Sequence, residues 1–144
     1  MTVTKSPAEI ITRDCLAARV RLLNRQVMRI YDDALRPLGI KVTQLNVLAA
    51  LGRLGACSPT TMTKLLDMEK STLSRNLERL RSRGLIKVQP GARGRAQQVV
   101  VTDQGRELLE QALPRWEAAQ ERVAKRLGAS TTTVLQQLPT MNRG

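Results

Sequence analysis

Hydrophobic residues recur at intervals of three and four positions in the first quarter of the chain. Within residues 8–36, this stripe consists of Leu16, Val20, Leu23, Val27, Ile30 and Ala34. The spacing predicts one long amphipathic helix over residues 8–36, and Pro37 and Gly39 are expected to end it. Such a stripe packs either in the core of its own chain or against a helix of a second chain. A helix this long in a chain of 144 residues indicates a dimer contact.

Two short helices are predicted after Gly39. The first covers residues 43–54. The second begins at Ser58 and Pro59, which supply an N-cap and a proline at the first helical position, and it breaks around residues 67–69. Its buried side is expected to consist of Met62, Leu65 and Leu66.

A third short helix is predicted over residues 70–82, with Gly84 as its C-terminal stop. Its inner face consists of Leu73, Leu77 and Leu80, which are spaced i, i+4 and i+7. Its outer face is polar and is expected to carry Ser71, Thr72, Ser74, Arg75, Asn76 and Arg79. Arginine and asparagine match the hydrogen-bonding edges of guanine and adenine in the major groove, and short hydroxyls can approach phosphates. This pattern is typical of a helix-turn-helix, although a helix that merely faces solvent would also carry such a face.

A β-hairpin is predicted directly after this helix. Residues 85–88 and 98–102 have the composition of two short strands, and the segment between them contains proline, glycine, Arg93 and Arg95. A hairpin that follows a helix-turn-helix is a winged arrangement. The helix would enter the major groove, and the arginines at the hairpin tip would lie along the neighbouring minor groove.

The rest of the chain is predicted to be helical. Residues 102–127 form a long helix that Pro114 should bend, and residues 131–138 form a short last helix before Pro139. The second apolar stripe consists of Leu109, Ala112, Trp116, Ala119, Val123 and Leu127. The predicted fold class is therefore mainly α with a small β-hairpin wing.

Positive charge is concentrated on the winged segment. The chain carries a formal charge of +12, and residues 70–102, with eight Lys or Arg and one acidic residue, supply +7 of it. Such a surface attracts polyanions, above all nucleic acid. Trp116 and Tyr31 are the only aromatic residues. That scarcity disfavours the stacking platforms that hold single strands and favours duplex DNA.

Composition also excludes several function classes. The chain contains no histidine and only two cysteines, Cys15 and Cys57. Two distant thiols do not make a zinc site, and a Ser or Cys nucleophile would lack its usual histidine base. We therefore expect no enzyme, no metal and no cofactor. The sequence also lacks a membrane-spanning run and a signal peptide, which indicates a cytoplasmic protein.

Three segments resemble the MarR family of winged helix-turn-helix repressors. They are residues 35–51 (LRPLGIKVTQLNVLAAL), 71–86 (STLSRNLERLRSRGLI) and 99–109 (VVVTDQGRELL), and the resemblance extends over roughly residues 8–127 in the family's order. It implies one domain over residues 1–144, in which 8–36 and 103–140 form the dimerisation region and 43–102 form the DNA-binding lobe. It also implies a homodimeric repressor that binds a pseudo-palindromic operator in double-stranded DNA and is released by a small ligand.

The resemblance assigns DNA contacts by position. It places Ser71, Thr72, Ser74, Arg75 and Asn76 at the major groove. The expected DNA contacts also include Lys70, Arg79, Arg93 and Arg95. Arg95 would lie in the minor groove. The family wing typically has Asp-x-Arg, and this chain has Arg93-Gly94-Arg95, so the acid that usually braces the wing arginine is replaced by a further cation.

Two modes of regulation stay open. Cys15 lies two residues from the position of a peroxide-sensing cysteine in one branch of the family, which makes a thiol-based oxidant sensor one alternative. A buried, unreactive Cys15 is the other interpretation, and Cys57 is expected to pack, in a short strand against the wing. A small-molecule pocket is implied between the DNA-binding lobe and the dimer helices, with Arg19, Met28, Tyr31 and Trp116 as candidate lining residues.

Three functions compete at this point. A sequence-specific repressor agrees with charge, periodicity and motif order. A non-sequence-specific architectural protein would bind duplexes with steep salt dependence and little preference among them. A winged helix used as a protein-interaction module would have a neutral outer face on the helix of residues 70–82, which Arg75 and Arg79 contradict.

Overall fold

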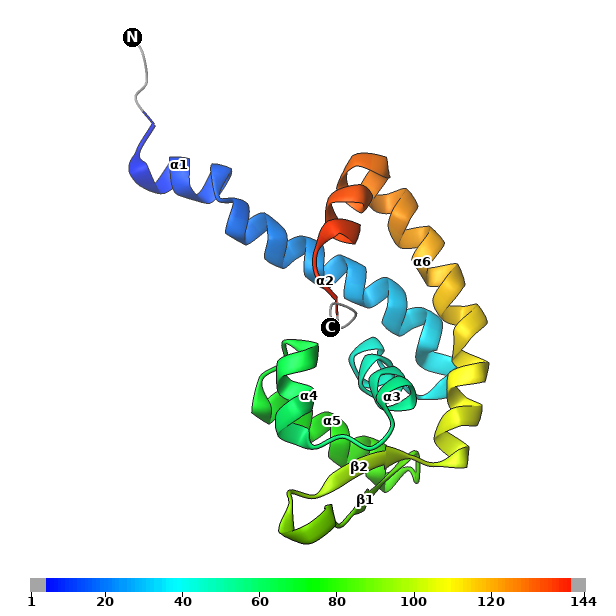
Figure 1. The fold of residues 1–144 in the computed structure, drawn as a ribbon. Helices are drawn as coiled ribbons and strands as arrows, with labels where there is room; N and C mark the ends of the chain where they lie inside the picture. The colour runs from blue at the N-terminus through cyan, green and yellow to red at the C-terminus, as the bar shows by residue number, and fades with distance from the viewer. Residues whose placement is uncertain (1–4, 141–144) are drawn as a thin grey trace.

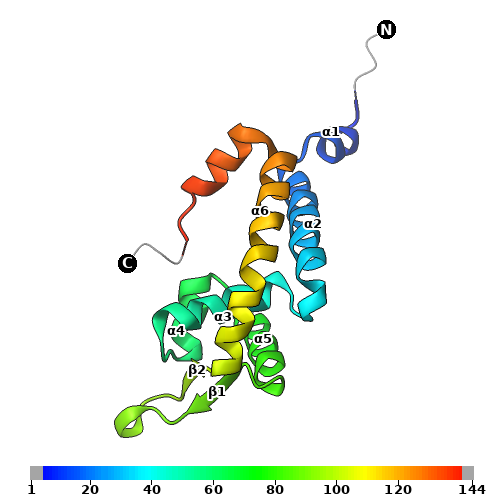
Figure 2. The ribbon, with the colours of Figure 1, turned by 90° about the vertical axis from the view of Figure 1, so that its right-hand side faces the viewer.

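Helices make up most of the computed structural model, which describes residues 5–140 (Figure 1). In chain order the elements are α1 (Pro7–Asp14), α2 (Leu16–Leu35), the 3-10 turn η1 (Arg36–Leu38), α3 (Val42–Leu54), α4 (Pro59–Leu66), α5 (Lys70–Ser82), β1 (Ile86–Gln89), the 3-10 turn η2 (Ala92–Gly94), β2 (Gln98–Val101) and α6 (Asp103–Gln137). This order confirms the predicted fold class. α3, α4, α5 and the hairpin form a lower lobe, and α2 and α6 rise from it side by side (Figures 1 and 2).

The prediction of one continuous helix over residues 8–36 is wrong, because the helix is interrupted at Cys15. Cys15 has extended backbone angles (φ −63°, ψ 111°) and separates α1 from α2. The guanidinium of Arg19 donates to the carbonyl of Arg13 at 2.8 Å and so satisfies a backbone group that the break leaves free. α1 has no buried residue. Packing within one chain therefore does not hold α1 in line with α2.

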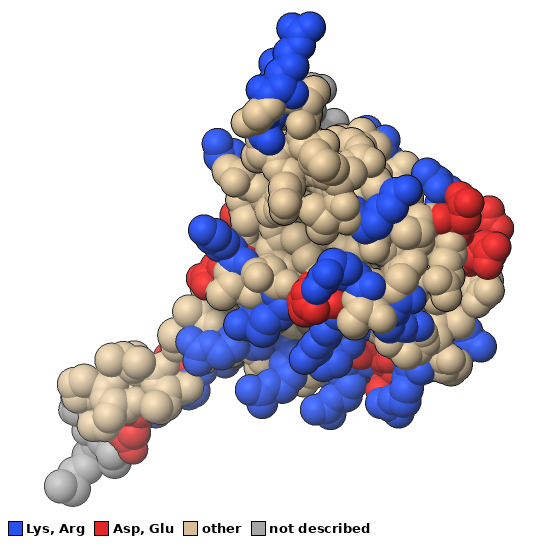
Figure 3. Space-filling model, turned by 90° about the horizontal axis from the view of Figure 1, so that it is seen from below, with Lys and Arg blue, Asp and Glu red and all other residues tan. Residues whose placement is uncertain are grey.

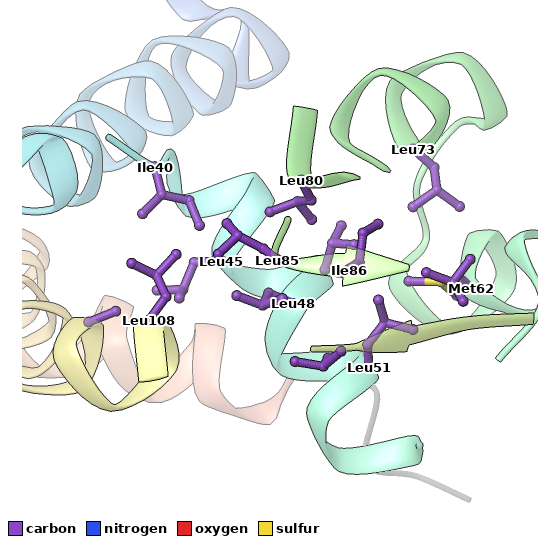
Figure 4. Packing of buried hydrophobic residues seen from close by; sticks show 14 of the residues in the cluster. Ile40, Leu45, Leu48, Leu51, Met62, Leu73, Leu80, Leu85, Ile86 and Leu108 are labelled. Atoms are coloured by element: carbon purple, nitrogen blue, oxygen red, sulfur yellow. The ribbon is translucent and has the colours of Figure 1, made fainter. Parts of the chain in front are cut away.

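The lower lobe is built around the apolar faces of α3, α4 and α5. α3 starts one residue before the predicted helix, and α5 covers the predicted range. Figure 4 shows Leu48, Leu51 and Met62 packing against residues of α5 and the hairpin. The expected burial of Leu65 is wrong: its side chain is 37% exposed, whereas Met62 is 1% exposed. α4 contacts mainly α5, so only a narrow stripe of the side chains of α4 is buried.

The predicted wing is present and is joined to the lobe by a backbone bridge. β1 and β2 pair antiparallel, from Ile86 opposite Val101 to Gln89 opposite Gln98. Cys57 adds one further pairing, because its N–H donates to the carbonyl of Val99 at 3.1 Å and its own carbonyl accepts from Val99 at 2.8 Å. This bridge confirms the expectation that Cys57 packs in a short strand against the wing.

α6 leads out of the lobe and along α2. The side chain of Thr102 caps its first turn by accepting from the N–H of Gly105 at 3.1 Å. The helix continues through Pro114, and its backbone leaves the helical region at Gly128 (φ 79°, ψ 165°). This confirms the predicted division into a long helix and a short last helix. Ala112, Ala119 and Val123 are buried, so the predicted apolar stripe faces the protein interior.

Gly105 lies where the first turn of α6 crosses the start of β1 and the end of β2. An ideal Cβ atom there would lie 2.7 Å from Cγ1 of Val101 and closer still to the carbonyl oxygen of Leu85. Because backbone cannot move aside cheaply, Gly105→Ala is expected to lower the free energy of unfolding by about 1 to 3 kcal/mol, as overpacking does. The measurement is urea unfolding followed by circular dichroism.

Gly52→Ala in α3 is the matched control for that substitution. A Cβ atom at Gly52 would meet only a methyl group of Leu109, at 3.1 Å, and a flexible side chain can shift. Its unfolding free energy should stay within about 1 kcal/mol of the wild type, because alanine also favours the helix. Equal stabilities of the two variants would contradict a close backbone contact at Gly105.

Candidate nucleic-acid interface

α5 presents one apolar face to the lobe and one polar face to solvent. Leu73 and Leu80 are buried, which fixes the opposite face outward. Exposed or half-buried residues of that outer face are Lys70, Ser71, Thr72, Ser74, Arg75 and Arg79. The guanidinium of Arg75 donates to the hydroxyl of Thr72 at 3.4 Å. Arg75 is thus loosely held by its own helix and is free to reach a base edge.

The expected exposure of Asn76 is wrong. Its side chain is only 7% exposed, and its Nδ2 donates to the sulfur of Met68 at 3.7 Å. Asn76 lies three residues after Leu73 and four before Leu80, so it shares their face of the helix. Its polarity suggested an outward position, but its place in the helical period puts it inside. Asn76 is therefore a core residue that ties α5 to the turn after α4.

Asn76→Ala is consequently expected to affect stability and not base preference. Loss of a buried hydrogen bond and of packing should lower the free energy of unfolding by about 1 to 2 kcal/mol. Ser74→Ala, on the exposed face of the same helix, should leave stability unchanged and serves as the control. Urea unfolding and a binding assay with variant duplexes measure the two effects. Altered base preference with unchanged stability would place Asn76 at the DNA instead.

The underside of the molecule is strongly cationic. Figure 3 views this face and shows many more Lys and Arg side chains than Asp and Glu. The basic residues of α5 and the hairpin are Lys70, Arg75, Arg79, Arg81, Arg83, Lys87, Arg93 and Arg95. Glu78 is the acidic residue of this segment, and it pairs with Arg81 at 3.1 Å. Within residues 5–140, Arg75, Arg79, Arg93 and Arg95 form no ion pair with a carboxylate.

The hairpin projects from the body (Figure 2), and its connecting segment contains Arg93 and Arg95. Arg93 and Arg95 are both exposed. Arg93 adopts left-handed backbone angles (φ 51°, ψ 48°), a conformation that aspartate and asparagine tolerate better than arginine does. Arg93 therefore brings some backbone strain as well as positive charge to the tip. Within residues 5–140 neither guanidinium forms an ion pair with a carboxylate, so both are available to a polyanion.

Known proteins are similar to this chain in sequence and in fold. The model of the MarR family matches residues 38–97. The chain is 28% identical over 125 residues to the multiple antibiotic resistance protein MarR of Salmonella typhimurium, covering 85% of this chain and 87% of that protein. It is 30% identical to the M. tuberculosis transcriptional regulator MosR, with 85% of this chain and 90% of that one covered and a TM-score of 0.73. The chain belongs to the MarR family.

Structures with DNA are among the similar ones. A complex of M. tuberculosis MosR with DNA is 35% identical, covers 78% of this chain and 82% of that chain, and has a TM-score of 0.70. A mutant of E. coli MarR complexed with operator DNA has the same fold, with a TM-score of 0.78. It is 24% identical, and the match covers 88% of this chain and 92% of that chain. Proteins of the MarR family are DNA-binding transcriptional regulators and not enzymes, and this chain is such a regulator.

The cysteines of this MarR-family protein differ in environment. Cys57 is buried beside β2, and burial raises the pKa of its thiol above the ordinary value. A raised pKa lowers the fraction of thiolate, which is the reactive form of cysteine. Cys15 is half-buried at the break between α1 and α2. Oxidant sensing by Cys15 stays a prediction.

The four candidate pocket residues are not gathered in one cavity. The hydroxyl of Tyr31 donates to the side chain of Gln120, and Tyr31 and Trp116 both pack against the apolar core. Arg19 is exposed and bonds to the carbonyl of Arg13. Only Met28 lines the large cavity beside α2. Met28, Tyr31 and Trp116 all pack, partly buried, against the same core, and binding of a ligand by the four residues stays a prediction.

The large cavity lies between α2 and the start of α3 and has a volume of about 750 Å³. Its lining residues are Arg21, Asn24, Arg25, Met28, Arg29, Asp32, Asp33, Arg36, Gly39, Ile40 and Lys41. Five are cationic and two are acidic. Asp33 is paired with Arg36, and Asp32 accepts from the N–H of Val42 at 2.9 Å. Sequence reasoning missed this site, although arginine at every fourth position from 21 to 29 could have indicated it.

Neither a membrane segment nor a metal cluster is found in the described part of the chain. No helix within residues 5–140 is long and apolar enough to cross a membrane. The same residues contain no group of three or more His, Cys, Asp or Glu that could hold a metal ion.

Proposed function

We propose that this protein is a homodimeric, sequence-specific repressor that binds a pseudo-palindromic operator in duplex DNA and is released by a small anionic ligand. The observation that carries the proposal is the position of α5. Its apolar face is buried, and its outer face presents Arg75 and Arg79, without carboxylate partners in the described chain, beside the arginines of the wing. A rigid helix with free guanidinium groups suits direct contact with base edges.

The proposed contacts divide between the two grooves. Lys70, Ser71, Thr72, Ser74, Arg75 and Arg79 would meet the major groove and its phosphates. Arg93 and Arg95 would lie along the minor groove, where a narrow A·T tract attracts arginine. Asn76 is not among them, because it is buried.

The proposed homodimer is supported by apolar side chains that one chain leaves exposed. The N-terminal half of the predicted stripe is open to solvent, with Leu16 74% and Val20 63% exposed, whereas its C-terminal half packs against α6. Further exposed apolar residues near both ends of the chain are Ile10, Ile11, Leu22, Val134, Leu135 and Leu138. A soluble monomer rarely exposes so many large apolar groups in neighbouring elements. We therefore assign α1, α2 and α6 to dimerisation and residues 43–102 to DNA binding.

An anionic effector is favoured by the charge of the large cavity. Arginines of α2 and Lys41 surround it, while Met28 and Ile40 add apolar surface. A small aromatic carboxylate combines the two properties. Such a ligand would favour a dimer in which the two α5 helices are wrongly spaced for successive major grooves.

Added aromatic carboxylates should raise the melting temperature of the protein and lower its affinity for the operator. The matching uncharged amides should change neither quantity.

A selection from random duplexes tests the DNA-binding proposal. Repeated rounds of binding should enrich a pseudo-palindrome whose half-site centres are one helical turn, about 34 Å, apart. Steep salt dependence without any enriched sequence would contradict the proposal and favour the architectural alternative.

A further inference from the structure

The C-terminal end of the recognition helix is tied to the linker between α2 and α3 by one side chain. Arg83 follows the last turn of α5. Its Nη1 donates to the carbonyl of Gly39 at 2.8 Å and its Nη2 donates to the carbonyl of Leu38 at 3.0 Å. Two bonds from one planar guanidinium to consecutive carbonyls give directional as well as energetic restraint.

Gly39 supplies the left-handed turn against which this guanidinium lies. Its backbone is left-handed (φ 65°), and a Cβ atom there would lie 3.6 Å from Nη1 and 3.8 Å from Cζ of Arg83. The arginine therefore lies against the linker itself and not against a side chain. The same linker is also fixed to α2, because the carboxylate of Asp32 accepts from the N–H of Val42 at the start of α3. Together these bonds connect α2, the linker and α5.

We propose that Arg83 is a positioning residue for operator binding. By holding the end of α5 against the linker, it fixes the orientation of the recognition helix relative to α2. If α2 belongs to the dimer interface, this contact sets the separation of the two recognition helices, which must match successive major grooves. The inference rests on the proposed dimeric, sequence-specific function. The buried leucines of α5 fix which face of the helix is turned outward, and the two bonds of Arg83 add a directional restraint at its C-terminal end.

The same contact reaches the large cavity. Gly39 lines that cavity and also a smaller one bordered by Lys41, Arg79 and Arg83. Movement of the linker on ligand binding would therefore strain or release the bonds of Arg83 first. In this way Arg83 links the cavity beside α2 to the helix that contacts DNA.

Arg83→Met and Arg81→Met form a matched pair for the test. Each removes one positive charge near the end of α5, but within residues 5–140 the side chain of Arg81 bonds only to Glu78 of its own helix. Binding is measured on the selected operator, on a duplex with a single half-site, and on operators with one or two base pairs added at the centre. Arg83→Met is expected to bind the operator roughly tenfold more weakly than Arg81→Met. It should bind the single half-site equally well and should no longer discriminate between spacings.

Arg83→Lys covers the possibility that Arg83→Met does not fold, which thermal unfolding would show. It keeps the charge but lacks the planar fork that spans two carbonyls, so it should also lose the preference for spacing. If the wild type prefers one operator spacing and both folded variants keep that preference, the proposal for Arg83 is overturned. The proposed function is not affected by that result. A wild type without any sequence preference would instead contradict the proposed function, so the two failures are distinguishable.

Discussion

Replacing Leu16 with aspartate is expected to yield a folded monomer that no longer binds the operator tightly. Leu16 is 74% exposed in a single chain, so the substitution should leave the subunit's own fold intact. In the proposed dimer each copy would lose the burial of one leucine, worth about 1.5 to 3 kcal/mol. Symmetry doubles this to about 3 to 6 kcal/mol, and an unpaired carboxylate in the interface adds to it. The dimer should weaken by at least roughly 100-fold.

Light scattering at micromolar concentration and circular dichroism provide the two readouts. Leu54→Asp is the matched control, because Leu54 is also exposed but lies at the end of α3, outside the proposed interface. That variant should remain dimeric and bind DNA as the wild type does. A Leu16→Asp protein that stays dimeric would place the interface elsewhere and would remove the basis for two symmetric half-sites.

The elements that sequence predicts well are those fixed by local rules. The bounds of α5 follow from leucines at helical spacing and from Gly84, whose positive φ of 72° suits a helix end. The hairpin follows from apolar runs around a segment rich in glycine and arginine. Its first strand lies one residue later than predicted, and its second strand begins at the predicted residue and ends one residue earlier. Local backbone preference and tertiary packing agree at these positions.

Sequence reasoning failed where polarity and packing disagree. Asn76 was assigned to the outer face by its chemistry, although the helical period places it between Leu73 and Leu80 on the inner one. The break at Cys15 involves neither proline nor glycine, so no local rule reports it. The orientation of Tyr31 depends on Gln120, a residue 89 positions away. Contacts of that range are set by the packing of α6 on α2, which a pattern along one segment cannot contain.

The second large effect is expected for Arg75→Ala in the recognition helix. Arg75 is exposed on the outer face of α5 and has no carboxylate partner in residues 5–140. A bidentate contact with a base is worth about 1 to 3 kcal/mol of discrimination. Because the proposed dimer uses two half-sites, binding of the operator should weaken by about 2 to 6 kcal/mol. The affinity for unrelated duplexes should fall much less, so base preference at one position in each half-site is lost.

Arg95→Ala in the wing is the informative counterpart, because it removes the same charge from a different part of the cationic face. A contact with the minor groove and its phosphates should weaken binding to most sequences and lower the dependence on salt concentration. Titrations of both variants against operator and random duplexes at several salt concentrations separate the two roles. If Arg75→Ala weakens binding to every duplex equally, α5 contacts the backbone only. Sequence preference would then have to come from the shape of the DNA and not from its base edges.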